Sequence, residues 1–578
     1  MWRNTGSYRP RRLFNLHLAS LCLVACLAPH AQPADVVVVR PAEWEGAMAN
    51  WKQHRESQGH TLLELDGRMG KDAIRAAIVN IARQQAEAGQ ADELKHVLIV
   101  GDVGNDPTIH IGTFYYTSTA MVQFGGEHML ASDNPFGDLD NDGIPELAVG
   151  RIPANSPAEL QRVLDRIVAF ETQQDSTSWR RDVHMVAGVG GFGALADSVI
   201  EMTTRQFLAQ RIPGWSNVSM THASAQSNYC PDPELFSSTL INRINQGGML
   251  WVYIGHGAVT QLDYLRVEER QIPILTEDQV GKFQAGTRAP IAVFLACYTG
   301  AFDAQEDSLA ERLILSDNGP IAALAASRVA GPYGLAMLSD GLLTEYFDLP
   351  TETLGLAILH AKQCSLQAAS KEGNATTDPP PSQLDMVAAI AQALSPADYD
   401  LAAERAEHAW QMNLLGDPLL RLPQPSELSV DAPTQASAGE EFEVTGHATL
   451  AGQLSVELIH RRGQHRPDLE HLATDPITIA GRAGMQQRYQ SSNDSVILKR
   501  SVNLAPPASP LTSRPTSSQI VLTNISTHPD GNTAPATVPF SVTMRVPDDL
   551  PRGRYGLRLF LSSPQGWEVG YAEILIKP

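Results

Sequence analysis

The chain has 578 residues, of which 43 are Lys or Arg and 64 are Asp or Glu, so its formal net charge is −21. This acidic balance argues against a general nucleic-acid binder and against electrostatic docking on anionic lipid, because both need clustered basic side chains. The length predicts about two to four domains, and five cysteines are too few for a disulfide-built scaffold.

The first 34 residues have the pattern of an export signal. Four arginines precede the apolar stretch Leu13–Ala28, which is too short for a membrane span. Leu23–Cys26 resembles the lipobox of bacterial lipoproteins, in which Cys26 becomes the lipidated first residue; a simple cut near Ala31 is the alternative. We therefore expect an exported protein, either an outer-membrane lipoprotein or a periplasmic or secreted one, attached to a membrane only through a lipid anchor.

Between residues 35 and 423, apolar runs bounded by Gly, Pro or Asp alternate with helical patterns. Such runs suit strands buried on both faces, and the alternation predicts an α/β unit, with one sheet or two subdomains wrapped by helices. The predicted strands are Val36–Val39, His96–Val100, Glu146–Val149, Val183–Val189, Met249–Ile254, Ile291–Ala296 and Ile321–Ala325. The predicted helices are Trp44–Gln58, Lys71–Ala88, Ala158–Gln173, Ala194–Gln210, Glu234–Gln246, Asp307–Leu315 and Asp398–Asn413.

After Pro423 the pattern changes. Short alternating runs, among them Glu441–Val444, Leu454–Ile459 and Val538–Met544, are separated by Gly, Pro, Asn and Ser turns and show little helical periodicity. This spacing predicts an antiparallel β-sandwich over residues 424–578. Asn503–Thr537, rich in Pro, Ser and Thr, is expected to be a long exposed loop within it.

An acidic loop comes just before the third predicted strand, Glu146–Val149. Asp138, Asp140 and Asp142 alternate before a glycine, as in the opening of calcium loops, where carboxylates converge on a hard cation. An EF-hand needs Glu at its twelfth position, where Val149 stands, but Glu146 would serve in a shorter loop. We expect these four acidic side chains to hold a structural Ca2+, the alternative being an Asp-rich turn without an ion. Zinc is not expected, because no Cys or His pairs occur at ligand spacing.

A glycine-rich turn, Gly188–Gly193, fits the G-x-G-x-x-G pattern of dinucleotide-binding proteins. The acidic residue that such a site needs about 20 residues later is missing, because Arg211–Pro213 occupies that place. We interpret the motif as a tight turn between a strand and a helix, with no nucleotide cofactor.

Two predicted strands end in residues that carry chemistry. Met249–Ile254 is followed by His256 between two glycines, and Ile291–Ala296 is followed by Cys297. The carboxyl ends of parallel strands open onto one edge of the sheet, so the two side chains would face each other across a cleft. Each residue alone is more often structural, since cysteine after an apolar strand is commonly buried and inert.

Together, His256 and Cys297 predict nucleophilic catalysis. A thiolate attacks an acyl carbon, while a nearby imidazole lowers the thiol pKa and protonates the leaving group. The oxyanion then needs fixed N–H donors, which the amides of Gly257 and Cys297 would provide. After removal of the signal segment, Cys230, Cys297 and Cys364 remain, and this odd number leaves at least one free thiol unless a cysteine pairs between chains.

The sequence around this pair resembles the gingipain-type cysteine peptidases and, more distantly, caspases, legumains and clostripain. The resemblance extends over residues 35–423. It is carried by Tyr253–Gly257, Phe294–Cys297, Ser132–Asp140, Gly150–Pro153, Ala301–Glu311 and the closing motif Asn413–Pro418. It implies a caspase-like α/β fold followed by an immunoglobulin-like domain, where the β-sandwich is predicted.

The resemblance also implies residue roles. Cys297 would be the nucleophile, His256 the general acid and base, and the amides of Gly257 and Cys297 the oxyanion hole. Asp133 lies where the family places an acid in its primary specificity pocket, which would favour Arg or Lys before the cut. Tyr333, in a second pocket wall over residues 325–334, would act as a lid.

The sequence thus predicts an exported cysteine endopeptidase that hydrolyses protein or peptide substrates through an acyl-enzyme, with no cofactor for catalysis. Its parts are a signal peptide over 1–34, a peptidase domain over 35–423 and an immunoglobulin-like domain over 424–578. The alternative is a catalytically inactive adhesion or scaffolding protein on the same fold. A cysteine transpeptidase would share the acyl-enzyme and differ in joining the product to an added amine.

Overall fold

A computed structural model describes residues 33–577 apart from 92, 176, 191–210, 350, 372–382, 397, 463–468, 470, 473 and 507–536. The predicted signal segment, the predicted helix Ala194–Gln210 and most of the predicted loop Asn503–Thr537 lie outside the described residues. So do the last three residues of the G-x-G-x-x-G motif.

The first unit is built on one ten-stranded sheet in the order β2-β1-β3-β6-β14-β13-β12-β9-β7-β8. Neighbouring strands are parallel except for the antiparallel pair β13 and β14. Strands β1, β3, β12 and β13 are buried at every residue, as expected for apolar runs covered on both faces. The strands are β1 (Val36–Arg40), β2 (Leu62–Asp66), β3 (His96–Val100), β6 (Ala148–Ile152), β7 (Asp182–Ala187), β8 (Asn217–His222), β9 (Leu250–Ile254), β12 (Ile291–Leu295), β13 (Ala322–Ala326) and β14 (Met412–Leu415).

Strand β14 joins two halves of this sheet. It lies between β6, from the first half of the unit, and β13, from the second. Residue Leu415 pairs with both Arg151 of β6 and Ala323 of β13. The sequence left open whether there are one or two subdomains, and this strand makes them one continuous sheet.

Helices contact one another in two groups. One contains α1 and α3 together with α7, and the other contains α8, α9, α10 and α11. Two short hairpins, β4–β5 and β10–β11, stand apart from the main sheet. The helices of this unit are α1 (Ala49–Ser57), α2 (Lys71–Glu87), α3 (Pro157–Thr172), α6 (Phe236–Asn245), α7 (Leu309–Leu315), α8 (Pro332–Leu343), α9 (Leu354–Lys371), α10 (Gln383–Leu394) and α11 (Leu401–Gln411). The hairpin strands are β4 (Phe114–Thr117), β5 (Met129–Ser132), β10 (Tyr264–Val267) and β11 (Arg270–Pro273).

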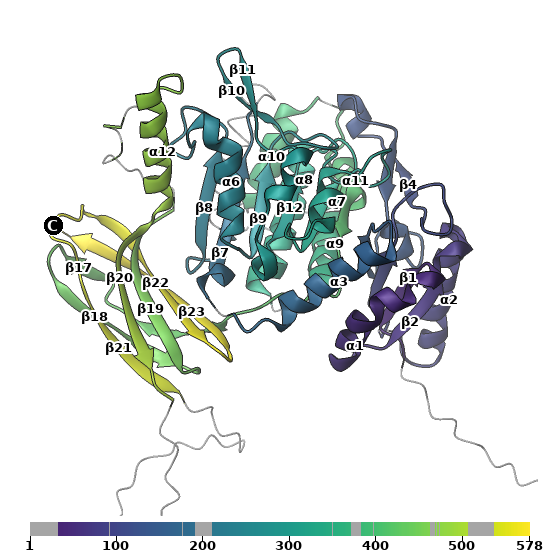
Figure 1. Cartoon of the computed structure of the whole chain (residues 1–578), viewed down its shortest axis with the longest axis horizontal. Helices are drawn as coiled ribbons and strands as arrows, with labels where there is room; N and C mark the ends of the chain where they lie inside the picture. The colour runs from purple at the N-terminus through teal and green to yellow at the C-terminus, as the bar shows by residue number, and fades with distance from the viewer. Residues whose placement is uncertain are drawn as a thin grey trace, which may run out of the picture.

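The second unit is the predicted β-sandwich, seen beside β8 in Figure 1. One sheet contains β15, β23, β22, β19 and β20, with β17 added to β23, and the other contains β16, β18 and β21. Strand β18 alternates buried and exposed residues, which is the period-2 pattern of a sheet with one solvated face. The strands are β15 (Ser426–Glu427), β16 (Ser429–Asp431), β17 (Gln435–Ser437), β18 (Glu441–Ala448), β19 (Gly452–His460), β20 (Val496–Leu504), β21 (Val538–Arg545), β22 (Gly553–Ser563) and β23 (Gly566–Lys577).

Helix α12 (Ile479–Asn493) interrupts the sandwich between β19 and β20, where the sequence predicted only strands and turns. It packs on β8, the edge strand of the first unit (Figure 1). The Asn493 side chain accepts from the Met220 amide at 2.7 Å and donates to the Met220 carbonyl at 2.9 Å. The side chain thereby satisfies edge-strand groups that a further strand would otherwise pair.

A buried ion network joins the two units. The Glu457 carboxylate of β19 accepts from Arg181 of the first unit at 3.1 and 3.0 Å and from Arg558 of β22 at 2.8 Å. Lys499 lies 3.2 Å from the same carboxylate. Burial opposes ionisation of Glu457, but the surrounding cations outweigh it and lower its pKa to about 2.

We expect Glu457→Gln to destabilise the protein by about 3–5 kcal/mol at pH 7, because it leaves buried arginines without their counter-charge. A carboxyl with a lowered folded-state pKa stabilises the fold above its unfolded pKa, and this contribution is lost as the pH falls toward the folded value. The difference between wild type and variant should therefore shrink from about pH 4.5 down to about pH 2.

Urea denaturation across this pH range measures the effect. Glu573→Gln is the matched control, because Glu573 lies in the same sandwich but forms only exposed ion pairs with Arg461 and Arg554. It should change stability by less than about 1 kcal/mol. Equal losses in the two variants would contradict the role given to the buried network.

Candidate active site

The register between β9 and β12 brings His256 and Cys297 to the same edge of the sheet. Ile254, the last residue of β9, pairs with Leu295, the last residue of β12. His256 and Cys297 each follow that pair by two residues. Both are partly exposed. The predicted arrangement at the carboxyl ends of adjacent parallel strands is thus the one that the backbone adopts.

Close backbone packing fixes the turn that leads into His256. A Cβ on Gly255 would lie 2.9 Å from the Cα of Gly188 and 2.7 Å from the Tyr253 hydroxyl oxygen, so neither distance leaves room for a side chain. The Tyr253 hydroxyl, on a fully buried ring, donates to the His256 carbonyl at 2.6 Å. Gly188, the first residue of the dinucleotide-like motif, is therefore needed for close approach between β7 and β9.

Gly257 lies directly against the backbone that carries the thiol. A Cβ added there would lie 2.6 Å from the Cys297 carbonyl oxygen and 2.7 Å from a methyl carbon of Thr299. Only glycine permits this approach between the loop after β9 and the loop after β12.

The Cys297 thiol has a polar neighbour in the segment after β13. The Ala330 amide donates to Cys297 Sγ at 3.3 Å, and the Ala330 carbonyl lies 3.8 Å from it. Burial raises the thiol pKa, the Ala330 amide lowers it, and the nearby Glu127 carboxylate raises it again, so that the net shift is upward. A thiol with a raised pKa is mostly protonated at neutral pH and needs a base before it can act as a nucleophile.

Tyr298, the residue after the thiol, has a φ of 58°, which is the left-handed region that a residue with a side chain rarely adopts. Its amide donates to the Arg328 carbonyl at 3.1 Å. Its hydroxyl donates to both Glu127 oxygens, each at 2.9 Å. Strained backbone held by such contacts is typical of functional sites, and here it turns the chain sharply away from β12.

Asp133 lies in a different environment from the one that the sequence predicted. Its carboxylate accepts from Arg151 at 2.7 and 2.8 Å and from the Thr113 hydroxyl at 2.8 Å, and its amide donates to Asn413 at 3.0 Å. Asp133 is 3% exposed and Arg151 is fully buried. A carboxylate committed to a buried guanidinium is not available to a substrate, so the structure does not support the pocket role of Asp133.

Tyr333 is likewise buried rather than placed as a lid. It lies in the first turn of α8, is 4% exposed, and its hydroxyl is hydrogen-bonded to Arg405 of α11. It packs with Met121 and Met337 in a small hydrophobic cluster. The wall predicted over residues 325–334 does reach the thiol, but through the Ala330 backbone.

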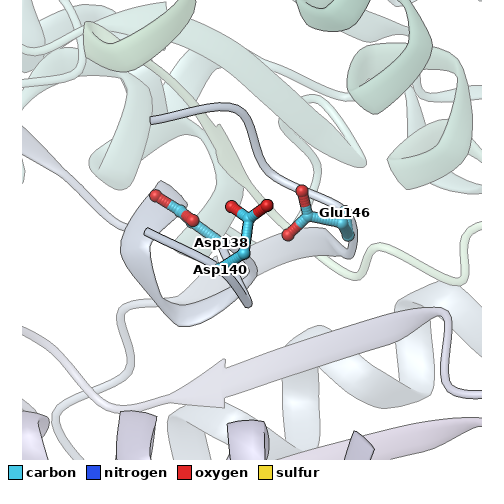
Figure 2. Close-up of side chains that lie close together, drawn as sticks. All are labelled: Asp138, Asp140 and Glu146. Atoms are coloured by element: carbon cyan, nitrogen blue, oxygen red, sulfur yellow. The ribbon is translucent and has the colours of Figure 1, made fainter. Parts of the chain in front are cut away.

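The acidic loop brings three of its four predicted ligands together. Oxygen atoms of Asp138, Asp140 and Glu146 lie within 4.8 Å of one another (Figure 2). Asp142 is not part of this cluster, and its carboxylate accepts from the Ile144 amide at 2.7 Å. Burial raises the pKa of Glu146, the Leu139 amide opposes this, and the neighbouring aspartates raise it further. Oxygen donors that repel one another fit a hard divalent cation, which would relieve that repulsion.

Glu127 and the ion pair between Arg328 and Asp303 are features of the site that sequence reasoning missed. Arg328 donates to Asp303 at 2.8 and 2.6 Å, and its carbonyl holds Tyr298. Glu127 lies in the exposed segment before β5, about 170 residues from the thiol in sequence. No local motif marks it, and only the fold brings it to Cys297.

The other cysteines differ from the thiol at the sheet edge. Cys230 is fully buried in a loop, and burial raises its pKa to about 12. Cys364 lies on α9 and is exposed. None of these three cysteines forms a disulfide.

A large parallel sheet with His and Cys leaving adjacent strands at its carboxyl edge, followed by a β-sandwich, defines a caspase-like cysteine peptidase fold. The model of peptidase family C25 matches residues 30–423. The chain therefore belongs to peptidase family C25, the gingipain-type cysteine peptidases, as the sequence resemblance predicted.

Curated relatives include two proteins of Porphyromonas gingivalis. Gingipain R1 is 21% identical over 288 residues, which are 49% of this chain and 26% of the relative. Gingipain R2 is 21% identical over 284 residues, 48% of this chain and 34% of the relative. The matches thus span about a quarter to a third of the length of these curated relatives.

Two solved structures are similar to this chain over most of its length. One described as a protease has a TM-score of 0.51 at 14% identity, covering 94% of this chain and 98% of the other. The Arg-specific cysteine proteinase gingipain R has a TM-score of 0.49 at 15% identity, covering 95% of this chain and 99% of the other.

We expect Asp133→Asn to cost about 3–5 kcal/mol of stability, because the buried Arg151 loses its charged partner. Thermal or urea denaturation measures this loss. Asp66→Asn is the control, since Asp66 pairs with Arg68 at the surface and should cost less than about 1 kcal/mol. If stability is unchanged but the preference among peptide reporters changes, the result would instead support the predicted role of Asp133 in the substrate pocket.

Proposed function

We propose that this protein is a cysteine endopeptidase that hydrolyses peptide bonds through a dyad of Cys297 and His256. The observation that carries the proposal is the register of β9 and β12, which sets both residues two positions beyond one strand pair. Membership of a peptidase family supports the same assignment.

In the proposed reaction, His256 takes the proton from the Cys297 thiol, and the thiolate attacks the carbonyl carbon of the scissile bond. The amides of Gly257 and Cys297 donate to the oxyanion of the tetrahedral intermediate. His256 then returns the proton to the leaving amine, which leaves a thioester on Cys297. Water, deprotonated by His256, attacks the thioester and releases the carboxylic acid.

The raised pKa of the Cys297 thiol explains why the proposed reaction needs His256. Because burial disfavours the free thiolate, an imidazolium next to it is needed to stabilise the ionised thiol near neutral pH. Loss of the imidazole should thus leave a thiol that ionises only at alkaline pH.

We further propose a preference for cleavage after basic residues. The acidic residue that supports this preference is Glu127 rather than Asp133. Glu127 is an exposed carboxylate close enough to Cys297 to raise the pKa of its thiol. The charges of Arg328 and Asp303 balance each other, so the group with Glu127 carries one net negative charge. A cationic side chain entering beside the thiol would be attracted to it.

The predicted export signal and lipobox support a further proposal, that the protein works outside the cytoplasm, with Cys26 as a lipid anchor or after a cut near Ala31. No helix among the described residues is long and apolar enough to span a membrane. The mass of the mature N-terminus would distinguish a lipidated Cys26 from an unmodified Gln32.

A peptidyl-arginyl chloromethyl ketone is expected to add once, at Cys297, near neutral pH. Cys297→Ala should abolish the adduct, and His256→Ala should slow its formation by about 10²–10⁴-fold, with recovery only as the pH rises. Glu127→Gln should slow the arginyl reagent more than a leucyl one. Intact-mass and peptide mass spectrometry measure each adduct.

The exposed Cys364 provides a reference thiol within the same molecule. Labelling of Cys364 or Cys230 in preference to Cys297 would favour the inactive adhesion or scaffolding alternative. A reporter product joined to an added amine would identify a transpeptidase.

We also propose that Asp138, Asp140 and Glu146 hold a structural Ca2+. Calorimetric titration of the chelator-treated full-length protein should show binding that Asp140→Asn and Glu146→Gln each weaken strongly. Asp142→Asn is the matched control and should bind as wild type does, because Asp142 lies outside the cluster of three carboxylates. The absence of heat in the wild type, or equal loss in Asp142→Asn, would contradict this site.

A further inference from the structure

The start of α7 is bonded to both loops that carry the proposed dyad. The Leu309 amide donates to the Val259 carbonyl at 2.6 Å, and the Ala310 amide donates to the Thr299 carbonyl at 3.0 Å. Val259 lies three residues after His256, and Thr299 lies two residues after Cys297. These two amides are among those that a helix leaves without internal partners, so the helix end serves as a bracket between the loops.

A capping box holds this end of the helix in place. The Ser308 amide donates to the Glu311 carboxylate at 2.7 Å, and the Glu311 amide donates to the Ser308 hydroxyl at 3.4 Å. Ser308 and Thr299 are fully buried, and Glu311 is 1% exposed. The cap is thus inside the protein, where no water can replace a lost partner.

The Glu311 carboxyl group has a second partner in Asp102, which follows the end of β3. The two carboxyl groups are close enough for each to affect the ionisation of the other. A hydrogen bond between two carboxyl groups needs one of them to be protonated, because an ionised carboxylate only accepts. Burial raises the pKa of both carboxyl groups, which favours one shared proton between the main sheet and α7.

We propose that Glu311 is a positioning residue for the dyad, which fixes the start of α7 so that its first two amides hold the loops after His256 and Cys297 in register. This inference rests on the proposed peptidase function. Glu311 does not contact the substrate; it acts through the helix end and the two loop carbonyls.

The charges around the pair make this bracket sensitive to alkaline pH. The groups that face it are Asp102, Asp307 and the Arg151 guanidinium, whose hydrogen bonds go to Asp133 and to the Gly101 and Ile111 carbonyls. Burial, followed by the negative charge of Asp102, raises the pKa of Glu311, and burial raises that of Asp102 despite the opposing effect of Arg151. Loss of the shared proton at high pH would leave two neighbouring carboxylates that repel each other and loosen the cap.

Three variants test the inference. Glu311→Ala removes the carboxyl group that serves both the Ser308 amide and Asp102. It should lower kcat by about 10- to 100-fold with little change in KM, since small misplacements of reacting groups have effects of that size. Glu311→Gln keeps an acceptor for the Ser308 amide and offers a donor to an ionised Asp102, so it should recover most of the loss. Asp102→Asn should retain activity in the same way.

A second readout does not depend on peptide cleavage. The rate of Cys297 alkylation by iodoacetamide is measured against that of Cys364 in the same sample, from pH 6 to pH 10, by peptide mass spectrometry. In the wild type, the ratio of Cys297 to Cys364 alkylation should begin to fall at a lower pH than in Glu311→Gln or Asp102→Asn. In each variant an amide side chain, which cannot ionise, replaces one of the two carboxyl groups. Glu311→Ala should show a low ratio throughout.

Glu159→Ala is the matched control. Glu159 occupies the corresponding position at the start of α3, where its carboxylate accepts from the Asn155 amide at 2.8 Å, away from both loops. Equal effects of Glu159→Ala and Glu311→Ala on the alkylation ratio, or identical pH profiles for wild type, Glu311→Gln and Asp102→Asn, would overturn the positioning role. If Cys297 of the wild type is no more reactive than Cys364, the proposed peptidase function itself is contradicted. This outcome differs from those that contradict only the positioning role of Glu311.

Discussion

The parallel pairing of β9 with β12 is the constraint on which the site depends. Because the two strands end at one residue pair, the loops that follow them start level, and His256 and Cys297 reach the same height above the sheet. The glycines around His256 let those loops approach more closely than any side chain would allow. A slip of one residue between the strands would turn each side chain to the opposite face of the sheet.

Around this pairing, buried polar contacts hold the surrounding elements in one arrangement. Arg151 ties β6 to Asp133 and to the carbonyls of Gly101 and Ile111, which lie at the same end of the sheet. The fully buried His408 of α11 accepts from the Gly331 amide at 2.7 Å, one residue beyond the Ala330 amide that contacts the thiol. The buried ion pair of Arg151 and Asp133 thus supports the elements beneath the site, whereas the Glu127 carboxylate lies exposed beside the thiol.

Much of the fold could be predicted from the sequence because its strands are apolar on both faces. The prediction for His96–Val100 matches β3, and those for β1, β9 and β12 differ by a residue at an end. Strand β14 was missed, because Met412–Leu415 directly continues a helix and its assignment depends on distant partners. Strand β2 is half-buried along its length and gives no comparable apolar signal.

The same distinction holds for the site. His256 and Cys297 could be found because each follows a recognisable strand, and the acidic loop because its ligands are close in sequence. Asp133 was assigned to a pocket because its partner Arg151 is visible only in three dimensions. Glu127 and the bracket formed by Glu311 also arise from contacts between distant segments, which no local pattern encodes.

The central position of β14 has a consequence for the order of folding. Until Met412–Leu415 joins the sheet, β6 and β13 are both open edges with unpaired backbone groups, although every other strand of the sheet precedes it in the chain. Without this last strand, the sheet consists of two incomplete halves. Premature termination before that strand would yield an aggregation-prone product rather than a smaller working enzyme.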